Sequence, residues 1–385
     1  MSRPPATLAE HLARRIEAEG PLTLAAWMAE CLGNERWGYY RTRDPLGARG
    51  DFTTAPEISQ VFGELLGLWA ADCWARMGAP SAVRVVELGP GRGTLMQDFL
   101  RAARVLPAFR AAIDLHLVET SPVLRARQAE ALAGAGATWH DSLDTVPDGP
   151  VIAIANEFFD ALPIHQIERT PAGWAERRVD LAENGGFRLA LDPRPTALAA
   201  TLPPALAALP PGAVVELCPA AAAIARDLGQ RLARWGGAAL AIDYGHARPG
   251  AGETLQAMRR HAFAPVLEAP GEADLTAHVD FGALAAAARA GGAESWGPVP
   301  QGDLLRVLGA AERGRRLAAS AAPAQAEAIR TALARLIDAD QMGTLFKALA
   351  LTAPGFGPPA GFAVTPTPGP AAVPAPTPPK PMEQP

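Results

Sequence analysis

A glycine-rich turn with the sequence ELGPGRGT, which begins at Glu87, is the segment with the clearest chemical potential. It follows a short apolar run and precedes a stretch with helical spacing, so the turn is expected to join a strand to a helix. Glycine lets backbone N–H groups approach a ligand closely, and such units bind nucleotide-like molecules. Gly89, Gly91 and Gly93 follow a G-x-G-x-G spacing, which differs from the G-x-G-x-x-G of dinucleotide-binding folds.

The acids near this turn indicate which nucleotide-like ligand would fit. Glu87 stands two residues before the first glycine, where its charge would disfavour a phosphate but suit an amino group and a sulfonium cation. S-adenosyl-L-methionine carries both cations, whereas NAD carries a pyrophosphate, so the former is the expected cofactor. Glu119 ends the next expected strand and could accept both ribose hydroxyls, a position that dehydrogenases also use. Asp141 and Ser142 follow a third strand and could contact the adenine amine, although Asp141 could equally be a helix cap.

A polar and aromatic cluster, NEFFDALP, follows the fourth expected strand. Ligands of open α/β sheets bind outside the carboxyl ends of the strands, so this is where a substrate would arrive. Asn156 offers both a donor and an acceptor, and Glu157 and Asp160 could hold a cationic or hydrogen-bonding nitrogen. Phe158 and Phe159 could form a lid or pack beneath a neighbouring insertion.

The region that must position these residues alternates between short apolar runs and helical stretches, which predicts an α/β fold with a Rossmann-like sheet. Runs such as VIAIA and AALAI are continuously apolar, as expected for parallel strands covered on both faces. The expected strands are Val83–Leu88, Asp114–Glu119, Ala137–His140, Val151–Ala155, Val214–Leu217 and Ala238–Asp243, with helices at Thr94–Arg104 and Ser121–Leu132.

Residues 1–80 read as a helical N-terminal region that is expected to close over the cofactor site. Within it, Thr54 and Glu57 have the spacing of a capping box, which predicts a helix that starts there and runs to about Met77.

Two insertions interrupt the expected sheet. Alternating apolar residues around PAG and ENGG turns predict a β-meander at 164–191, and a less regular insertion covers 246–280. A helix is expected at Ala324–Ala339, and MGTLFKALAL, which begins at Met342, reads as the last strand. Proline dominates the end of the chain, which has no means of building a core. The expected divisions are a helical region, 1–80, a Rossmann-like domain, 81–355, and a disordered tail, 356–385.

The composition excludes several classes of protein. The chain has 385 residues and a net charge of −5, which argues against a nonspecific nucleic-acid binder. No apolar run is long enough to predict a membrane span. His261, His278 and Asp280 lack a second clustered pair, so no metal site is expected. Nothing in the sequence indicates an oligomeric state.

The cysteines and the N-terminal segment indicate a compartment. Three cysteines without metal-ligand spacing suit a reducing cytoplasm. The first twenty residues have no apolar signal stretch, and their three glutamates do not suit a transit peptide. A bacterial cytoplasmic location is therefore expected rather than the mitochondrial matrix.

The motifs together resemble the MidA-type methyltransferases, class I S-adenosylmethionine-dependent enzymes of bacteria and mitochondria, whose mitochondrial members are assembly factors for respiratory complex I. The motifs occur in order over about residues 35 to 350. They are RGDFTTAPEISQVFGE (Arg49–Glu64), ELGPGRGTL (Glu87–Leu95), VETSPVLRARQ (Val118–Gln128), NEFFDALPIHQ (Asn156–Gln166), AIDYG (Ala241–Gly245), DLTAHVDF (Asp274–Phe281) and MGTLFKAL (Met342–Leu349).

The resemblance implies a Rossmann-like methyltransferase sheet with substrate-side insertions. It implies that Gly50, Asp51 and Phe52 fold over the cofactor site. It also implies N-methylation of a protein arginine, in the symmetric mode, with a subunit of respiratory complex I as a candidate substrate. The residues that it implies hold the cofactor are Glu87, Gly89, Gly91, Gly93 and Glu119.

Methyl transfer from a sulfonium requires mainly the alignment of nucleophile, methyl carbon and sulfur. Our hypothesis is that Glu157 orients the target nitrogen, Asn156 helps define the donor side, and Asp51 or Asp160 completes the pocket. An alternative is an assembly chaperone that binds the cofactor but acts by docking a partner through the meander or the tail. An NAD-dependent oxidoreductase is disfavoured by Glu87 and by the glycine spacing.

Overall fold

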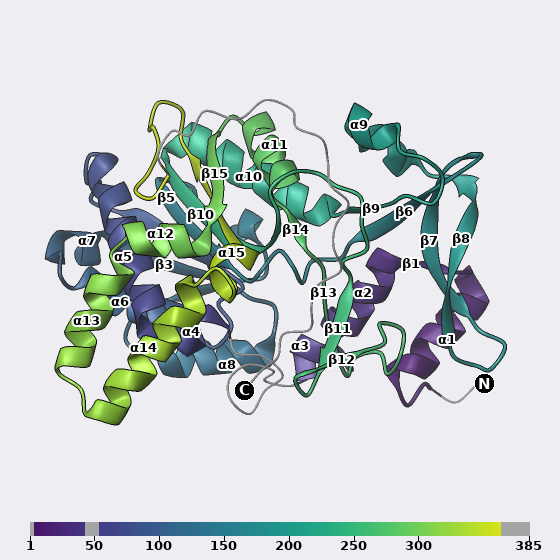
Figure 1. The fold of residues 1–385 in the computed structure, drawn as a ribbon, viewed down its shortest axis with the longest axis horizontal. Helices are drawn as coiled ribbons and strands as arrows, with labels where there is room; N and C mark the ends of the chain where they lie inside the picture. Colours follow the sequence, from purple (N-terminus) through teal and green to yellow (C-terminus); the bar gives the residue numbers. More distant parts are fainter. Residues whose placement is uncertain (1–3, 43–53, 363–385) are drawn as a thin grey trace.

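The computed structural model describes residues 4–42 and 54–362, and an eight-stranded sheet lies at its centre (Figure 1). The strand order is β15-β16-β10-β5-β2-β3-β4, with β14 paired to β10. β4, β3, β2, β5 and β10 are parallel, whereas β16 runs antiparallel between β10 and β15. The strands are β2 (Val83–Leu88), β3 (Ile113–Val118), β4 (Thr138–His140), β5 (Val151–Asn156), β10 (Gly237–His246), β14 (Val279–Asp280), β15 (Glu294–Pro300) and β16 (Phe346–Thr352).

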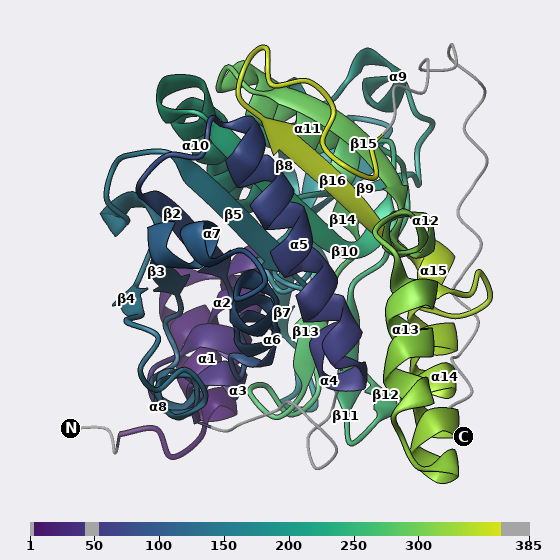
Figure 2. The same cartoon turned by 90° about the vertical axis from the view of Figure 1, so that its left-hand side faces the viewer.

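Helices cover both faces of this sheet, as the continuous apolar runs predicted. Ile152 and Ile154 of β5 pack in a core with α5 and α6, whereas Ala153 and Ala155 pack on the opposite face with α10 and α11. Figure 2 shows α5 crossing the near face of the sheet. The flanking helices are α5 (Gln60–Arg76), α6 (Thr94–Ala103), α7 (Pro107–Ala112), α10 (Pro219–Trp235) and α11 (Phe281–Ala290).

The remaining helices connect or extend these layers. The expected helix near the C-terminus is present, and the first residues of the expected last strand form a helical turn before β16. No helix in the described ranges is long and apolar enough to cross a membrane. These elements are α8 (Pro122–Ala131), η1 (Leu143–Thr145), η2 (Ala197–Thr201), α9 (Pro204–Ala207), α12 (Gln301–Val307), α13 (Ala310–Ala319), α14 (Pro323–Ile337) and α15 (Met342–Leu345).

A second sheet carries the N-terminal helices. Its order is β1-β7-β6-β9, and β8 pairs with β7. The first helices pack on this sheet, although about 150 residues of sequence separate them (Figure 1), and the ring centroids of Trp27 and Phe187 lie 4.7 Å apart. The elements are α1 (Leu8–Glu19), β1 (Leu22–Thr23), α2 (Leu24–Gly33), α3 (Tyr39–Thr42), β6 (His165–Thr170), β7 (Gly173–Leu181), β8 (Phe187–Pro195) and β9 (Val214–Leu217).

Two strand predictions need correction. Val214–Leu217 was expected in the central sheet, but it pairs antiparallel with β6 in the second sheet. The strand β15 was not predicted, because Gly297 and Pro298 interrupt its sequence like a turn; its register shifts there, between Trp296 and Val299. The second insertion forms a small sheet of β11 (Gln256–Arg259), β12 (Ala262–Ala264) and β13 (Asp274–Thr276).

The predicted capping box at Thr54 does not form. The segment is divided into α4 (Ala55–Ile58) and α5, and the Ser59 side chain caps the second helix. Thr54 makes no side-chain cap bond, and Glu57 instead accepts a hydrogen bond from the Thr94 hydroxyl. A tertiary contact has therefore replaced the local one.

The ordered chain extends further than its proline content predicts. Phe362 is 1% exposed and belongs to the main core, and Phe356 packs against the same core. Arg76 donates to the carbonyl oxygens of Phe356 and Pro358, at 2.8 and 2.9 Å. The expected tail therefore does not begin at residue 356.

Candidate functional site

A pocket of about 690 Å³ opens at the carboxyl ends of the central strands, where an open α/β sheet binds its ligands. Its described lining contains nine acidic side chains and only two basic ones, Arg41 and Arg92. The acids come from the strand ends of the central sheet, from α4 and α10, and from the second insertion. Such a lining favours a ligand with positive charge.

The glycine turn is one wall of the pocket. Gly89, Gly91 and Gly93 have φ values of 64°, 53° and 83°, a left-handed conformation that glycine adopts without a Cβ penalty. A Cβ on Gly89 would come within 2.8 Å of the Phe158 ring. The turn therefore requires glycine both for its backbone conformation and for its packing.

Glu119 lies beside this turn and is held by hydrogen bonds. Its carboxylate accepts from the backbone N–H of Ser121 at 2.7 Å and from Nε2 of Gln128 at 3.2 Å. Burial raises the pKa of Glu119, and these two bonds oppose the shift. Glu119 therefore holds Ser121, the N-cap residue of α8, and also forms part of the pocket wall.

Gln128 is a residue to which the sequence assigned no role. Its Nε2 also donates to the carbonyl oxygen of Gly91 at 2.7 Å, and its Oε1 accepts from the Trp139 indole at 2.8 Å. It thereby joins the glycine turn to the carboxylate of Glu119. Its position could have indicated a role, because Gln128 lies four residues after Leu124 and therefore on the apolar, buried face of α8.

Two buried oxygens in the pocket lack a hydrogen-bond partner among the described residues. They are Oε2 of Glu87 and Oδ1 of Asn156. Burial raises the pKa of Glu87 to about 8, and the nearby Glu119 carboxylate adds to the shift. Buried polar atoms normally have partners, so a ligand that donates hydrogen bonds or carries positive charge would fit here. The amino group of S-adenosylmethionine is such a donor.

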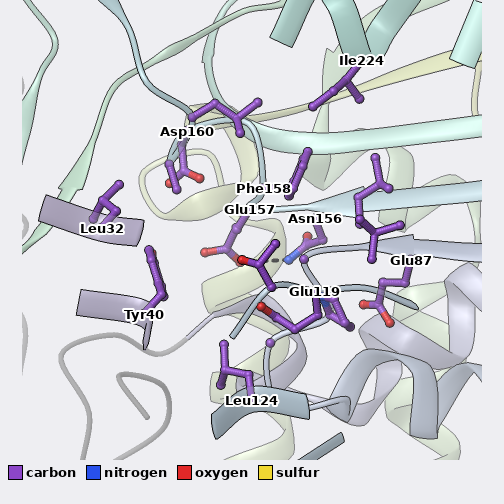
Figure 3. Close-up of a pocket in the computed structure, with 18 of the residues that line it drawn as sticks. Leu32, Tyr40, Glu87, Glu119, Leu124, Asn156, Glu157, Phe158, Asp160 and Ile224 are labelled. Carbon is purple, nitrogen blue, oxygen red and sulfur yellow. Dashed lines mark hydrogen bonds between the residues drawn. The ribbon is translucent and has the colours of Figure 1, made fainter. Parts of the chain in front are cut away.

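Glu157 is held where the strand β5 ends. Its φ of 49° is uncommon for a residue with a side chain, and such strain concentrates at functional sites. Its Oε1 accepts hydrogen bonds from the backbone N–H of Ala55 at 2.9 Å and from Nδ2 of Asn156 at 3.1 Å. Burial raises the pKa of Glu157 to about 7, against the Ala55 bond. In the view of Figure 3, Glu157 lies between Asp160 on one side and Glu87 and Glu119 on the other.

A buried acid, Asp243, holds the loop that carries Asp160. Asp243, at the end of β10, accepts from the backbone N–H groups of Phe159 at 3.0 Å and Asp160 at 3.2 Å. Its other oxygen accepts from the N–H of Tyr244 at 2.9 Å. Burial raises the pKa of Asp160 to about 6 and that of Asp243 well above its usual range. Asp243 was part of a family motif but had been assigned no role.

Further polar groups reach the pocket from distant segments. The hydroxyl of Tyr40, on α3, donates to Oδ1 of Asp274 at 2.9 Å, and both residues line the pocket. Tyr244 and Thr276 also line it. The sequence analysis assigned none of the four a role, although Tyr244, Asp274 and Thr276 stand in the family motifs. Neither spacing nor local pattern relates α3 to the second insertion.

The N-terminal region contacts the cofactor side of the pocket directly. Arg41 donates to the carbonyl oxygen of Thr120, and the Ser121 hydroxyl donates to the carbonyl oxygen of Tyr40. That residues 1–80 close over the site stays a prediction.

The remaining predicted residues divide into two groups. Asp141 and Ser142 line the pocket, and the Asp141 carboxylate pairs with Arg125 at 2.8 Å, so Asp141 does not act as a helix cap. Gly50, Asp51 and Phe52 lie outside the described residues. Among the described residues, no group of three potential metal ligands occurs.

Comparisons with known proteins agree with this geometry. Residues 65–299 match a family model described as "Putative S-adenosyl-L-methionine-dependent methyltransferase". A crystal structure from Burkholderia thailandensis, bound to S-adenosyl-homocysteine, superposes with a TM-score of 0.80 and 31% identity, over 92% of this chain and 93% of that one. The protein arginine methyltransferase NDUFAF7, mitochondrial, of Danio rerio is 40% identical over 89% of this chain and 86% of its own length. The human protein of that name is 38% identical over 80% of this chain and 74% of its own.

These relatives overturn one expectation. The names of the proteins from Danio rerio, Drosophila melanogaster and Homo sapiens all describe them as mitochondrial, which contradicts the predicted cytoplasmic location. The predicted bacterial cytoplasmic location was therefore wrong.

Proposed function

The chain belongs to the MidA-type family of S-adenosylmethionine-dependent methyltransferases, and from that premise we propose that it methylates an ω-nitrogen of arginine in a protein substrate. The family confirms the expected Rossmann-like fold, the cofactor and the methyltransferase class. The observation that carries the proposal is the excess of acids in the described lining of the pocket, nine against two arginines. Both the cofactor and a guanidinium are cationic, and a single acidic pocket suits both.

We infer the cofactor side from the groups that fit it. Glu87 and Asn156 offer the unpartnered oxygens for the amino group, and Glu119 offers a carboxylate for ribose hydroxyls. Gly89 and its two neighbouring turn glycines let the backbone approach the ligand. Asp141 and Ser142 lie at the pocket wall where the adenine is expected.

The acceptor side is inferred from Glu157 and Asp160. When bound, the cofactor supplies an electrophilic methyl group, and its sulfur keeps the electron pair of the broken C–S bond. Glu157 orients the ω-nitrogen toward that methyl group and receives the proton that the nitrogen loses. A carboxyl whose pKa is about 7 is suited to exchanging a proton near neutral pH. Asn156 fixes Glu157, and Asp160 adds negative charge around the guanidinium.

Finer assignments extend the same proposal. The names of the relatives support a mitochondrial protein substrate, and the motif resemblance supports a subunit of respiratory complex I, methylated in the symmetric mode. We also propose that residues 81–355 act as the methyltransferase domain, that residues 1–80 close over the cofactor site, and that the second insertion contributes to the acceptor side. The contacts of α3 with the loop after β3 support the first role, and the bond of Tyr40 to Asp274 supports the second.

Methyl labelling tests the proposal. The full-length protein is incubated with isotope-labelled S-adenosylmethionine and a mitochondrial extract, and labelled peptides are sequenced by mass spectrometry. The proposal expects label on arginine side chains of a discrete protein. Cofactor binding by calorimetry without any labelled protein would support the docking chaperone instead.

A further inference from the structure

Two carboxylates from separate parts of the fold line the acceptor end of the pocket. Asp160 follows β5 of the central sheet, whereas Asp274 begins β13 of the second insertion and is 4% exposed. The backbone N–H of Ala277 donates to the carbonyl oxygen of Asp160 at 2.9 Å, which ties the two segments together. Both acids line the same pocket.

Two tyrosines lie beside these acids. The Tyr40 hydroxyl donates to Oδ1 of Asp274 at 2.9 Å. Burial raises the pKa of Tyr40, and the charges of Asp274 and Asp160 add to the shift. Burial and the charge of Asp160 likewise raise the pKa of Tyr244, which lines the same pocket. Figure 3 shows Tyr40 and Asp160 on the same side of Glu157.

The arrangement suits a planar cation that donates several hydrogen bonds. A guanidinium presents five N–H donors in a plane and can bond carboxylates on two edges at once, which an ammonium cannot do in the same geometry.

We propose that Asp160 and Asp274 together bind the guanidinium of the acceptor arginine, and that Tyr40 and Tyr244 orient the two carboxylates. Asp274 then makes the second insertion part of the substrate site, and Tyr40 does the same for the N-terminal region. The inference rests on the proposed arginine methylation and names the residues that select arginine.

Asp274→Asn and Tyr40→Phe test the inference, each a change of one functional group with nearly constant shape. Initial rates of methyl transfer to arginine are measured against increasing amounts of mitochondrial extract. Asp274→Asn is expected to lower the initial slope at least about tenfold, because it leaves a desolvated cation without its carboxylate. Tyr40→Phe is expected to lower it less. Both variants should keep the plateau rate and the affinity for S-adenosyl-homocysteine within about threefold, because neither side chain is assigned to the cofactor and the bond of Tyr40 to Ser121 is made by its backbone carbonyl.

Glu272→Gln is the matched control, since Glu272 is exposed, lies two residues from Asp274 and is outside the described lining. If Asp274→Asn fails to fold, Tyr40→Phe alone decides. Slopes for the folded variants within twofold of the unmodified protein, with arginine still labelled, would overturn this inference and leave the proposed function standing. If the unmodified protein labels no arginine, the proposed function fails and the inference fails with it.

Discussion

Glu157 accepts a hydrogen bond from the backbone N–H of Ala55 at 2.9 Å, across 102 residues of sequence. This contact joins the acid at the end of β5 to the first turn of α4. The same helix provides Glu57, whose carboxylate accepts from Thr94 at the start of α6. The N-terminal region is therefore connected to the acceptor side of the pocket and to the glycine turn.

Gly89→Ala is expected to weaken cofactor binding by about tenfold or more, because the added methyl group meets the Phe158 ring at 2.8 Å and must displace the wall of the pocket. Gly134→Ala is the control: Gly134 has a φ of 79°, and nothing lies within 4 Å of the position that its added methyl group would take. Both substitutions place a Cβ on a residue with left-handed φ, which costs about 1–2 kcal/mol in backbone strain. Calorimetry with S-adenosyl-homocysteine should separate them, and equal affinities would contradict the proposed approach of the ligand to this turn.

The affinity for S-adenosylmethionine is expected to rise with pH between about pH 6 and about pH 8. The pKa of Glu87 in the free protein is about 8, so below that pH a cation must displace its proton, which costs up to about tenfold in affinity per pH unit.

The stability of the free protein should change in the opposite sense. Because its pKa is raised, Glu87 keeps its proton in the folded state, whereas the unfolded state releases it above about pH 4.5. The free energy of unfolding therefore falls as the pH rises from about 4.5 toward 8.

Calorimetry in buffers of different ionisation enthalpy measures the released protons. Glu87→Gln should flatten the pH dependence of binding and remove most of the proton release. An unchanged dependence in that variant would contradict the assignment of the proton to Glu87.

Gln128→Leu should weaken cofactor binding by about tenfold, because it removes the donor that joins Gly91 to Glu119 and leaves the Trp139 indole unpaired. Gln97→Leu is the matched control, since Gln97 is exposed and makes one long bond, to the carbonyl oxygen of Ala131 at 3.3 Å. Affinity is read from fluorescence or calorimetry at a temperature where both variants are folded. Similar affinities for the two variants would count against the role of this amide.

Phe362→Ala is expected to lower the free energy of unfolding by about 3–5 kcal/mol, the usual cost of removing a buried phenylalanine. Phe263→Ala should have little effect, because Phe263 is 56% exposed. Denaturant titration of both variants measures the difference. Equal stabilities would mean that the segment 356–362 does not contribute to the core.

The sequence predicted most of the central sheet because its signals are local. The run Val151–Ala155 is apolar at every position, and the glycine turn follows a strand directly. The segment Val214–Leu217 has a similar local strand signal but belongs to the second sheet. Composition alone could not assign that strand to one sheet or the other. Tyr40 and Asp274 could not be assigned to the acceptor side from the sequence, because their hydrogen bond spans 234 residues and only the tertiary fold creates it.

Local rules also failed where a tertiary contact competes. The capping box at Thr54 was predicted from spacing, but Glu57 bonds to Thr94 and the N–H of Ala55 bonds to Glu157. The conflict between local pattern and structure lies at the pocket itself, where departures from local preference are expected.

The most direct test of the account is the rate of methyl transfer to arginine by Glu157→Gln. Glutamine keeps an oxygen at the position that accepts from Ala55 and Asn156, so the fold and the affinity for S-adenosyl-homocysteine should remain. Without the carboxylate, the transfer rate is expected to fall by about a hundredfold or more. Full methylation of arginine by this variant would contradict the assignment of Glu157 as the group that orients the acceptor nitrogen and takes its proton.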